Sequence, residues 1–104
     1  MNNNFHKLEK DVCSILKSMM DKDNNFVRPL SDFWKNMKKD ICPIVDCYGL
    51  WISGDGTSCI NHKSIVDYYD TNLYHGCKQL QEFMNKHNMY LSWYDPSTAL
   101  IFFK

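Results

Sequence analysis

The sequence has little arginine and no long apolar run. Arg28 is the single arginine beside eleven lysines, so the forked guanidinium donors that suit planar phosphate or carboxylate groups are nearly absent. No stretch approaches the roughly 18 continuous apolar residues of a membrane-spanning helix, and the first residues lack the apolar core of a secretory signal peptide. We therefore expect a protein of a reducing compartment, cytoplasmic or nuclear, that makes no membrane contact.

The sequence also lacks net charge, because 12 basic residues balance 12 acidic ones. A neutral chain has no overall field that would gather it onto a nucleic-acid backbone or an anionic membrane. Ala99 is the single alanine, whereas asparagine and lysine are abundant. This skew is typical of an A+T-rich genome, and it suggests a viral origin as one hypothesis.

The chain is long enough for one hydrophobic core. It has 104 residues, of which 44% are hydrophobic and 14% aromatic, well clear of the composition at which chains stay disordered. We expect a single domain over residues 1–104, with residues 1–4 disordered.

Three main helices are predicted from apolar periodicity and capping residues. The first spans Phe5 to Met19 and turns one face inward: Phe5, Leu8, Val12, Ile15, Leu16 and Met19. The second begins at Ser31, ends before Pro43, and turns Phe33, Trp34, Met37 and Ile41 inward. The third is capped by Asn72 and runs from Leu73 to Asn88. Residues 63–69 are predicted as a further short helix, with a strand as the alternative.

Two hairpins are predicted from β-branched and aromatic runs around turn residues. One joins Ile44–Ile52 to Ser58–Asn61 through Gly54-Asp55-Gly56, unless that segment is a wider loop. The other joins Met89–Tyr94 to Ala99–Phe103 through Asp95-Pro96-Ser97-Thr98. Its apolar strands indicate that both of its faces are covered, either because the strands are central in the sheet or because a partner buries them. The fold class is therefore α+β, with three main helices packed on a small antiparallel sheet made of two hairpins.

A zinc site is one hypothesis for the cysteines. Cys42, Cys47, Cys59 and His62 follow a C-x4-C, x11, C-x2-H pattern, in which the two ligand pairs could meet across the first hairpin. Zinc knuckles prefer C-x2-C, and buried cysteines commonly serve as small hydrophobic residues. We therefore expect no cofactor.

A catalytic cysteine would need a nearby base, and His75 and Cys77 are the closest such pair in the sequence. Two residues at this offset on a helix face largely different ways. We therefore predict that the protein is not an enzyme and has no catalytic residues.

The order of three helices and a terminal hairpin resembles the topology of a winged helix. In that interpretation Leu73–Asn88 is the recognition helix, Asp95–Thr98 is the wing tip, and one set of side chains faces nucleic acid: His75, Lys78, Gln79, Gln81 and Lys86. The neutral charge and a wing without lysine or arginine argue against DNA binding. A mobility shift that weakens with salt would favour it.

The aromatic residues favour a different function. Three tryptophans, six tyrosines and six phenylalanines offer more amphipathic surface than a core of this size readily hides. Such side chains are common anchors of protein interfaces. We predict a protein-interaction or assembly module, with self-association through the aromatic hairpin as one form. The expected interface residues are Trp51, Tyr90, Trp93, Tyr94 and Phe102.

Overall fold

The computed structural model describes residues 2–36, 48–54 and 58–104. In these residues the chain forms the following elements: α1 (Asn2–Met19), β1 (Val27–Pro29), α2 (Leu30–Asn36), β2 (Gly49–Ser53), β3 (Cys59–Ile60), β4 (Lys63–Ser64), α3 (Lys78–Lys86), β5 (Met89–Asp95) and β6 (Thr98–Phe103). The first helix starts inside the four-residue segment for which the sequence predicts disorder.

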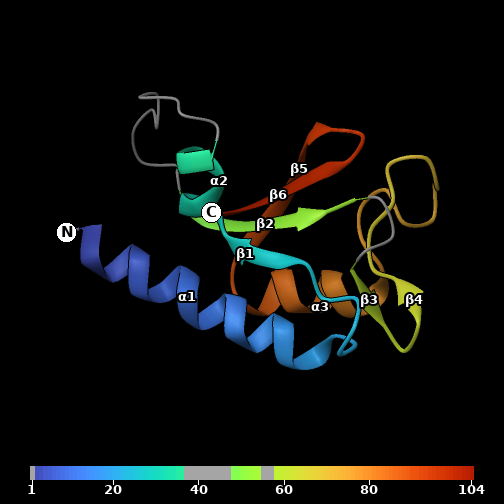
Figure 1. The fold of residues 1–104 in the computed structure, drawn as a ribbon, viewed down its shortest axis with the longest axis horizontal. Coiled ribbons are helices and arrows are strands. Elements are labelled where there is room, and N and C mark those ends of the chain that lie inside the picture. The colour runs from blue at the N-terminus through green and yellow to red at the C-terminus, as the bar shows by residue number, and fades with distance from the viewer. Residues whose placement is uncertain (1, 37–47, 55–57) are drawn as a thin grey trace.

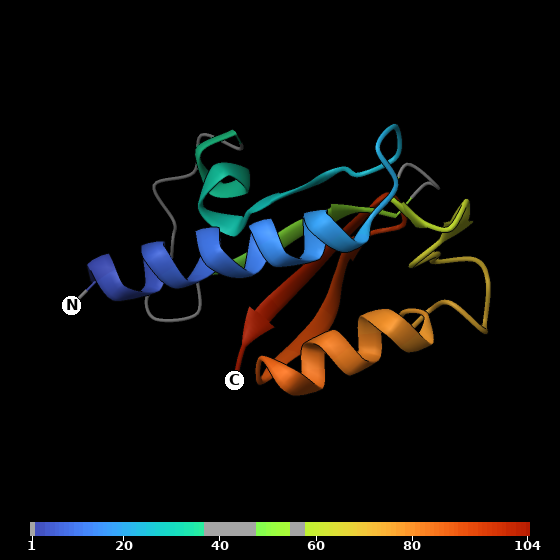
Figure 2. The same cartoon turned by 90° about the horizontal axis from the view of Figure 1, so that it is seen from below.

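Four strands form one antiparallel sheet in the order β1-β2-β6-β5, and β3 and β4 form a separate two-stranded ribbon. Helices α1 and α3 lie on one face of the sheet, and α2 lies on the other (Figures 1 and 2). The mixed α+β class and the antiparallel sheet are as predicted. The finer prediction of a sheet made of two hairpins is wrong, because β1 supplies a fourth strand and the ribbon stands apart.

The first predicted hairpin does not form. Instead of folding back on Ser58–Asn61, β2 pairs with β1 and β6, so Trp51 lies between Arg28 and Leu100. Strand β3 pairs with β4 through a tight turn at Asn61 and His62, whose φ angles are 52° and 64°. Asparagine tolerates these left-handed angles, so the chain turns at residues 61 and 62, where the sequence predicted the end of a strand.

The terminal hairpin forms where it is predicted, as β5 and β6. Its turn is held by the Asp95 carboxylate, which accepts the Ser97 N–H over 2.9 Å. Strand β6 is central, but β5 is an edge strand whose Tyr90 and Tyr94 are each 43% exposed. The expectation that both strands are central is therefore wrong for β5, and the alternative that a partner covers this strand stays a prediction.

Helix α1 occupies the predicted span but presents a narrower face to the core than predicted. Val12 and Leu16 are buried, whereas Leu8, Ile15 and Met19 are about two fifths exposed. These three residues lie on one stripe of the helix, beside its core face, because they are separated by seven and four residues, which is about two turns and one turn of a helix. The sheet contacts one side of the helix and leaves this stripe open.

The segment before α3 is irregular, not helical. Asp67 accepts the Tyr69 N–H and Asp70 accepts the Asn72 N–H, each two residues ahead, which are turn contacts that compete with a helix. Gly76 has a φ of +94°, so the chain bends before Cys77 and α3 begins at Lys78. The predicted helix over 63–69 and the predicted cap at Asn72 are both wrong, and the strand alternative holds for Lys63–Ser64, which form β4.

The main core lies between the sheet and the two helices α1 and α3. Its fully buried members include Leu16, Leu50, Ile52, Leu80 and Ile101. A second, smaller cluster lies on the opposite face of the sheet, where Leu30 and Phe33 of α2 pack on Leu100. The sheet therefore has one face that carries the main core under α1 and α3, and a second face that α2 covers in part.

Candidate interaction surface

Helix α2 is held over the sheet by a buried carboxylate from α1. Glu9 is 0% exposed, and its carboxylate accepts the Ser31 hydroxyl over 2.5 Å and the Ser31 N–H over 3.4 Å. The same carboxylate accepts the Gly49 N–H of β2 over 3.2 Å. One side chain therefore ties together α1, the first turn of α2 and the start of β2.

Aromatic side chains gather on the sheet face beneath α2. We call the following set the aromatic face: Phe26, Phe33, Trp34, Trp51, Tyr90, Tyr94 and Phe102. Phe33 is its centre, with ring centroids 5.2 Å from Trp34, 5.2 Å from Trp51 and 5.0 Å from Tyr94. All three contacts are edge-to-face, the arrangement that aromatic pairs favour.

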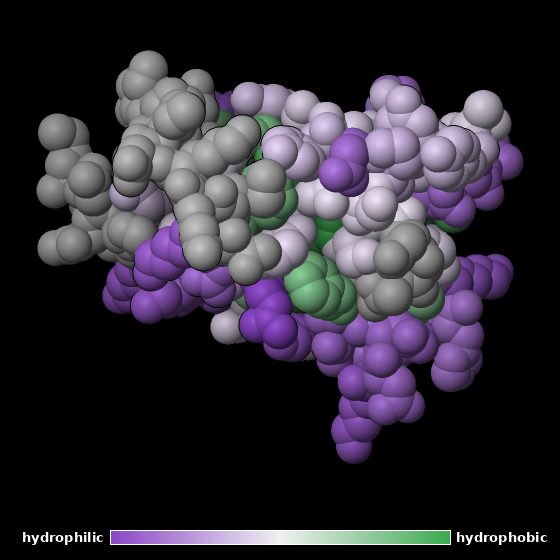
Figure 3. Space-filling view, turned by 45° about the horizontal axis from the view of Figure 1, so that its top comes forward, coloured by the Kyte–Doolittle hydropathy of each residue, from purple (hydrophilic) through white to green (hydrophobic). Residues whose placement is uncertain are grey.

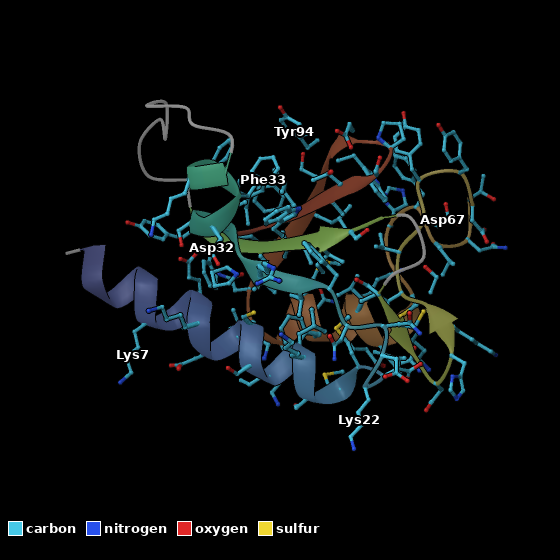
Figure 4. The ribbon with its side chains drawn as sticks, in the orientation of Figure 1. Lys7, Lys22, Asp32, Phe33, Asp67 and Tyr94 are labelled. Carbon is cyan, nitrogen blue, oxygen red and sulfur yellow. The ribbon has the colours of Figure 1, made fainter. Side chains whose placement is uncertain are left out.

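The aromatic face is only partly covered. Phe33 is buried, whereas Trp34, Trp51 and Phe102 are half-buried and the two β5 tyrosines are exposed. Figure 4 shows Phe33 and Tyr94 on the side of the sheet opposite to α1. In Figure 3, pale and green atoms, which mark weakly polar and hydrophobic residues, gather on the side turned toward the viewer, and purple hydrophilic atoms border it below. This side therefore presents mixed apolar and weakly polar surface.

One side of the aromatic face carries a charged side chain, Arg28. The Arg28 guanidinium lies 5.3 Å from the centre of the Phe26 ring, a cation–π contact that leaves Arg28 exposed. The indole N–H of Trp34 is buried and has no acceptor within residues 2–36, 48–54 and 58–104. The middle of the face therefore consists of rings, with the arginine at one side.

The structure brings together four of the five predicted interface residues. Trp51, Tyr90, Tyr94 and Phe102 belong to the aromatic face, and Tyr90 stacks on Phe102 with centroids 5.5 Å apart. Trp93 lies on the opposite face of the sheet, against the main core.

Trp93 has a packing function. Its ring meets Tyr68 edge-on at 5.3 Å, and its indole N–H donates to the Tyr74 carbonyl over 2.9 Å. A side chain at Gly54 would collide with this ring. Trp93 therefore fastens the irregular segment before α3 onto the sheet.

Sequence reasoning missed four residues that form or support this surface: Phe26 and Glu9, which it did not single out, and Phe33 and Trp34, which it predicted only as inward residues of the second helix. Phe26 precedes β1 and packs on Trp51 at 5.1 Å, and Glu9 positions α2. The one available signal for Glu9 was its place on the apolar side of a helical pattern, where a carboxylate requires partners. No sequence spacing links Glu9 to Ser31 and Gly49, since those contacts are long-range.

The proposed zinc ligands are only partly visible. Cys42 and Cys47 lie outside the described residues. Cys59 is buried, and burial together with the nearby Asp21 carboxylate raises the pKa of its thiol. His62 is exposed and lies 3.5 Å from Asp21, which also accepts the N–H groups of Asn61 and His62. Among the residues that the structure describes, no three His, Cys, Asp or Glu side chains cluster so as to hold a metal ion.

The predicted nucleic-acid residues lie at or before α3. Lys78, Gln79, Gln81 and Lys86 are exposed on the helix, while His75 is exposed in the segment that precedes it. The Gln81 amide donates to the Gly76 carbonyl over 2.8 Å, so it is occupied within the chain.

Cys77 is one of the residues that line a cavity of about 460 Å³ between the β3–β4 ribbon and the start of α3. Lys63, Ser64 and Gln79 supply its polar lining, and Ile65 and Leu73 supply apolar lining. The His75 ring packs on Tyr74 at 5.0 Å and is not among the lining residues. The cavity therefore does not join His75 to Cys77 as a base and a nucleophile.

Comparison with protein-family models, with curated proteins and with solved structures finds no match to this chain. In the described part of the chain, no helix has the length and apolar character required to cross a membrane. The function is therefore argued from the residues alone.

His87 makes the stability of the fold depend on pH. Burial, with a smaller contribution from Lys86, lowers the pKa of His87 below its ordinary value, and its Nε2 atom has no partner in the described residues. The unfolded chain therefore takes up a proton near its ordinary pKa of about 6.5, before the folded state does. We expect the free energy of unfolding to fall as the pH drops through this value toward the lower folded pKa.

Urea unfolding of the wild type, His87→Gln and His75→Gln at about pH 7.5 and about pH 5.5 measures this effect. The wild type and the exposed control His75→Gln should lose similar stability on acidification, and His87→Gln should lose less. Equal losses in all three proteins would contradict the assignment.

Proposed function

We propose that this chain is a non-enzymatic protein-interaction module and that the aromatic face is its binding surface. The observation that supports this most is the position of Tyr90 and Tyr94, which are 43% exposed yet packed against other rings of the face. Each therefore has a fixed ring with one side open to solvent. Rigid aromatic side chains lose little conformational entropy on binding and are frequent hot spots of interfaces.

Contacts within the molecule hold the rings of the aromatic face in place, which is consistent with this proposal. Phe33 holds Tyr94 and Trp51 from the α2 side, and Glu9 holds α2. A surface supported in this way keeps its shape before a partner arrives, which reduces the cost of ordering on binding. Arg28 at the margin adds a polar rim residue of the type enriched at interfaces.

The winged-helix-like alternative stays a hypothesis. The helix α3 is followed directly by a hairpin, but the hairpin tip carries Asp95 and no basic residue, and β2 separates β1 from the hairpin in the sheet. A mobility shift at low salt that disappears as salt is raised would favour nucleic-acid binding over the present proposal.

Capture from cells of the native source tests the proposal. The baits are the wild type, the double variant Tyr90→Ser/Tyr94→Ser, and the control Tyr69→Ser, which removes an 80% exposed ring outside the aromatic face. Loss of two hot-spot rings of about 2 kcal/mol each should weaken binding well over tenfold. The wild type and Tyr69→Ser should therefore retain the same protein, and the double variant should lose it.

Identical recovery with all three baits would contradict the proposal. Circular dichroism of each bait checks that the double variant keeps the fold, which is expected because neither tyrosine belongs to the buried core of the protein.

A further inference from the structure

The outer edge of β5 carries main-chain N–H and C=O groups that have no strand partner among the described residues. The sheet ends at β5, and β6 is its neighbour on the inner side. The Lys104 N–H donates to the Asn88 carbonyl over 2.9 Å, so these two residues form a hydrogen-bonded pair. In an antiparallel ladder such pairs alternate with pairs that share no hydrogen bond, so this contact identifies which residues of β5 bond to β6. Tyr90 and Ser92 therefore bond to β6, while Met89, Leu91 and Trp93 turn their N–H and C=O groups outward.

We propose that this edge pairs with β5 of a second copy of the chain, antiparallel and about a two-fold axis at Leu91. The inference rests on the proposed function, because Tyr90 and Tyr94 belong both to β5 and to the aromatic face. In this register Leu91 lies opposite Leu91 of the second copy, and Met89 lies opposite Trp93. All three outward-facing residues of each strand then donate and accept across the axis.

The charges along β5 fit antiparallel pairing of identical strands. No charged side chain lies between Met89 and Tyr94, so the pairing brings no like charges together at its centre. The strand is followed by Asp95 and preceded by Lys86, both exposed. A two-fold axis at Leu91 brings the end of β5 that carries Asp95 toward the start of β5 in the other copy, which follows Lys86 and has no carboxylate, so like charges do not meet at either end.

The net charge of the chain is also compatible with association of two copies. Its formal net charge is +0, so two copies do not repel each other at long range. An exposed edge of seven residues with apolar and aromatic side chains is a template for strand addition, which natural proteins either block or use. Between Met89 and Trp93 the edge has no lysine, proline or bulge that would block it, and the irregularity of the β5–β6 ladder falls beyond this stretch, between Trp93 and Asp95. Pairing would also join the aromatic faces of the two copies into one continuous surface.

Sedimentation of the purified full chain, over low to high micromolar concentrations, tests the pairing. The wild type should sediment as a dimer in the upper part of this range. Ser92→Lys places one lysine of each copy diagonally across the axis, and we expect it to raise the dissociation constant about tenfold at low salt and less at high salt. The matched control Ser92→Thr adds bulk without charge and should remain a dimer.

A second variant addresses the main-chain contacts directly. Leu91→Pro removes the N–H that points outward and leaves the bonds to β6 intact, so it should sediment as a monomer. Circular dichroism establishes that each variant is folded. If Leu91→Pro does not fold, Ser92→Lys alone decides the outcome.

A wild type that stays a monomer at high micromolar concentration would overturn the pairing, as would dimers that Ser92→Lys and Leu91→Pro leave unchanged. Neither result would contradict the proposed function, which the capture experiment with Tyr90→Ser/Tyr94→Ser tests by itself. Conversely, a β5 dimer with identical capture by all baits would support the pairing and contradict the wider aromatic-face proposal.

Discussion

Replacing Gly49 with alanine is expected to lower the free energy of unfolding by about 3 kcal/mol or more, because the change combines a steric clash with backbone strain. A Cβ atom at Gly49 would lie 1.8 Å from the Ile101 carbonyl oxygen and 2.9 Å from its carbon. Both atoms belong to the central strand β6, which cannot move without breaking the sheet. The φ angle of +154° at Gly49 is also one that side chains rarely adopt.

Urea denaturation followed by circular dichroism measures the effect. The matched control is Ser92→Ala, an exposed strand position where we expect a change within about 0.5 kcal/mol. A Gly49→Ala protein as stable as the control would show that β2 does not approach β6 as closely as described.

Replacing Glu9 with alanine is expected to cost about 3 kcal/mol of stability, because it leaves several buried donors without an acceptor. Those donors are the Ser31 hydroxyl, the Ser31 N–H and the Gly49 N–H. The substitution also removes the link between α1 and α2. We therefore expect the packing of Phe33 on the aromatic face to loosen together with the loss of global stability.

Thermal or urea unfolding measures the loss, and near-ultraviolet circular dichroism reports the packing of the rings. Glu82→Ala is the control, since Glu82 is an exposed glutamate on α3. Ser31→Ala removes only the hydroxyl donor and should cost about 1 kcal/mol. A Glu9→Ala loss no larger than that of Glu82→Ala would contradict the structural role of Glu9.

The parts of the fold that were predicted correctly depend on local patterns. The span of α1 follows from apolar spacing over four turns, and the β5–β6 hairpin follows from Asp95-Pro96 between two apolar runs. Strand β2 shows the limit of this reasoning. Its partners β1 and β6 are distant in sequence, and pairing to them is decided by burial of Leu50 and Ile52 in the common core.

The third helix was predicted too long for a related reason. The apolar spacing from Leu73 onward matches a helix, but Gly76 adopts a left-handed φ and the Asp67 and Asp70 carboxylates cap turns. Tertiary contacts such as the Trp93 bond to the Tyr74 carbonyl hold that segment in its irregular form. Periodicity alone does not reveal such contacts.

Only part of the candidate surface was predicted, because neighbouring residues of a strand point to opposite faces of the sheet. An aromatic count indicates that some rings reach the surface, but it does not separate Trp93 from its neighbour Tyr94. The register with β6 makes that separation: Trp93 joins the main core, and Tyr94 packs on Phe33. The contribution of α2 to this surface could not be foreseen, since it depends on the long-range contact of Glu9 with Ser31.

Site-specific photo-crosslinking tests most directly whether the aromatic face binds a protein. A benzophenone amino acid is placed at Tyr94, and in a separate protein at Tyr69, which is equally aromatic but outside the face. We predict that irradiation in the native cells yields a discrete crosslinked species with another protein from position 94, and none from position 69. Equal crosslinking from both positions, or none from position 94, would contradict the account.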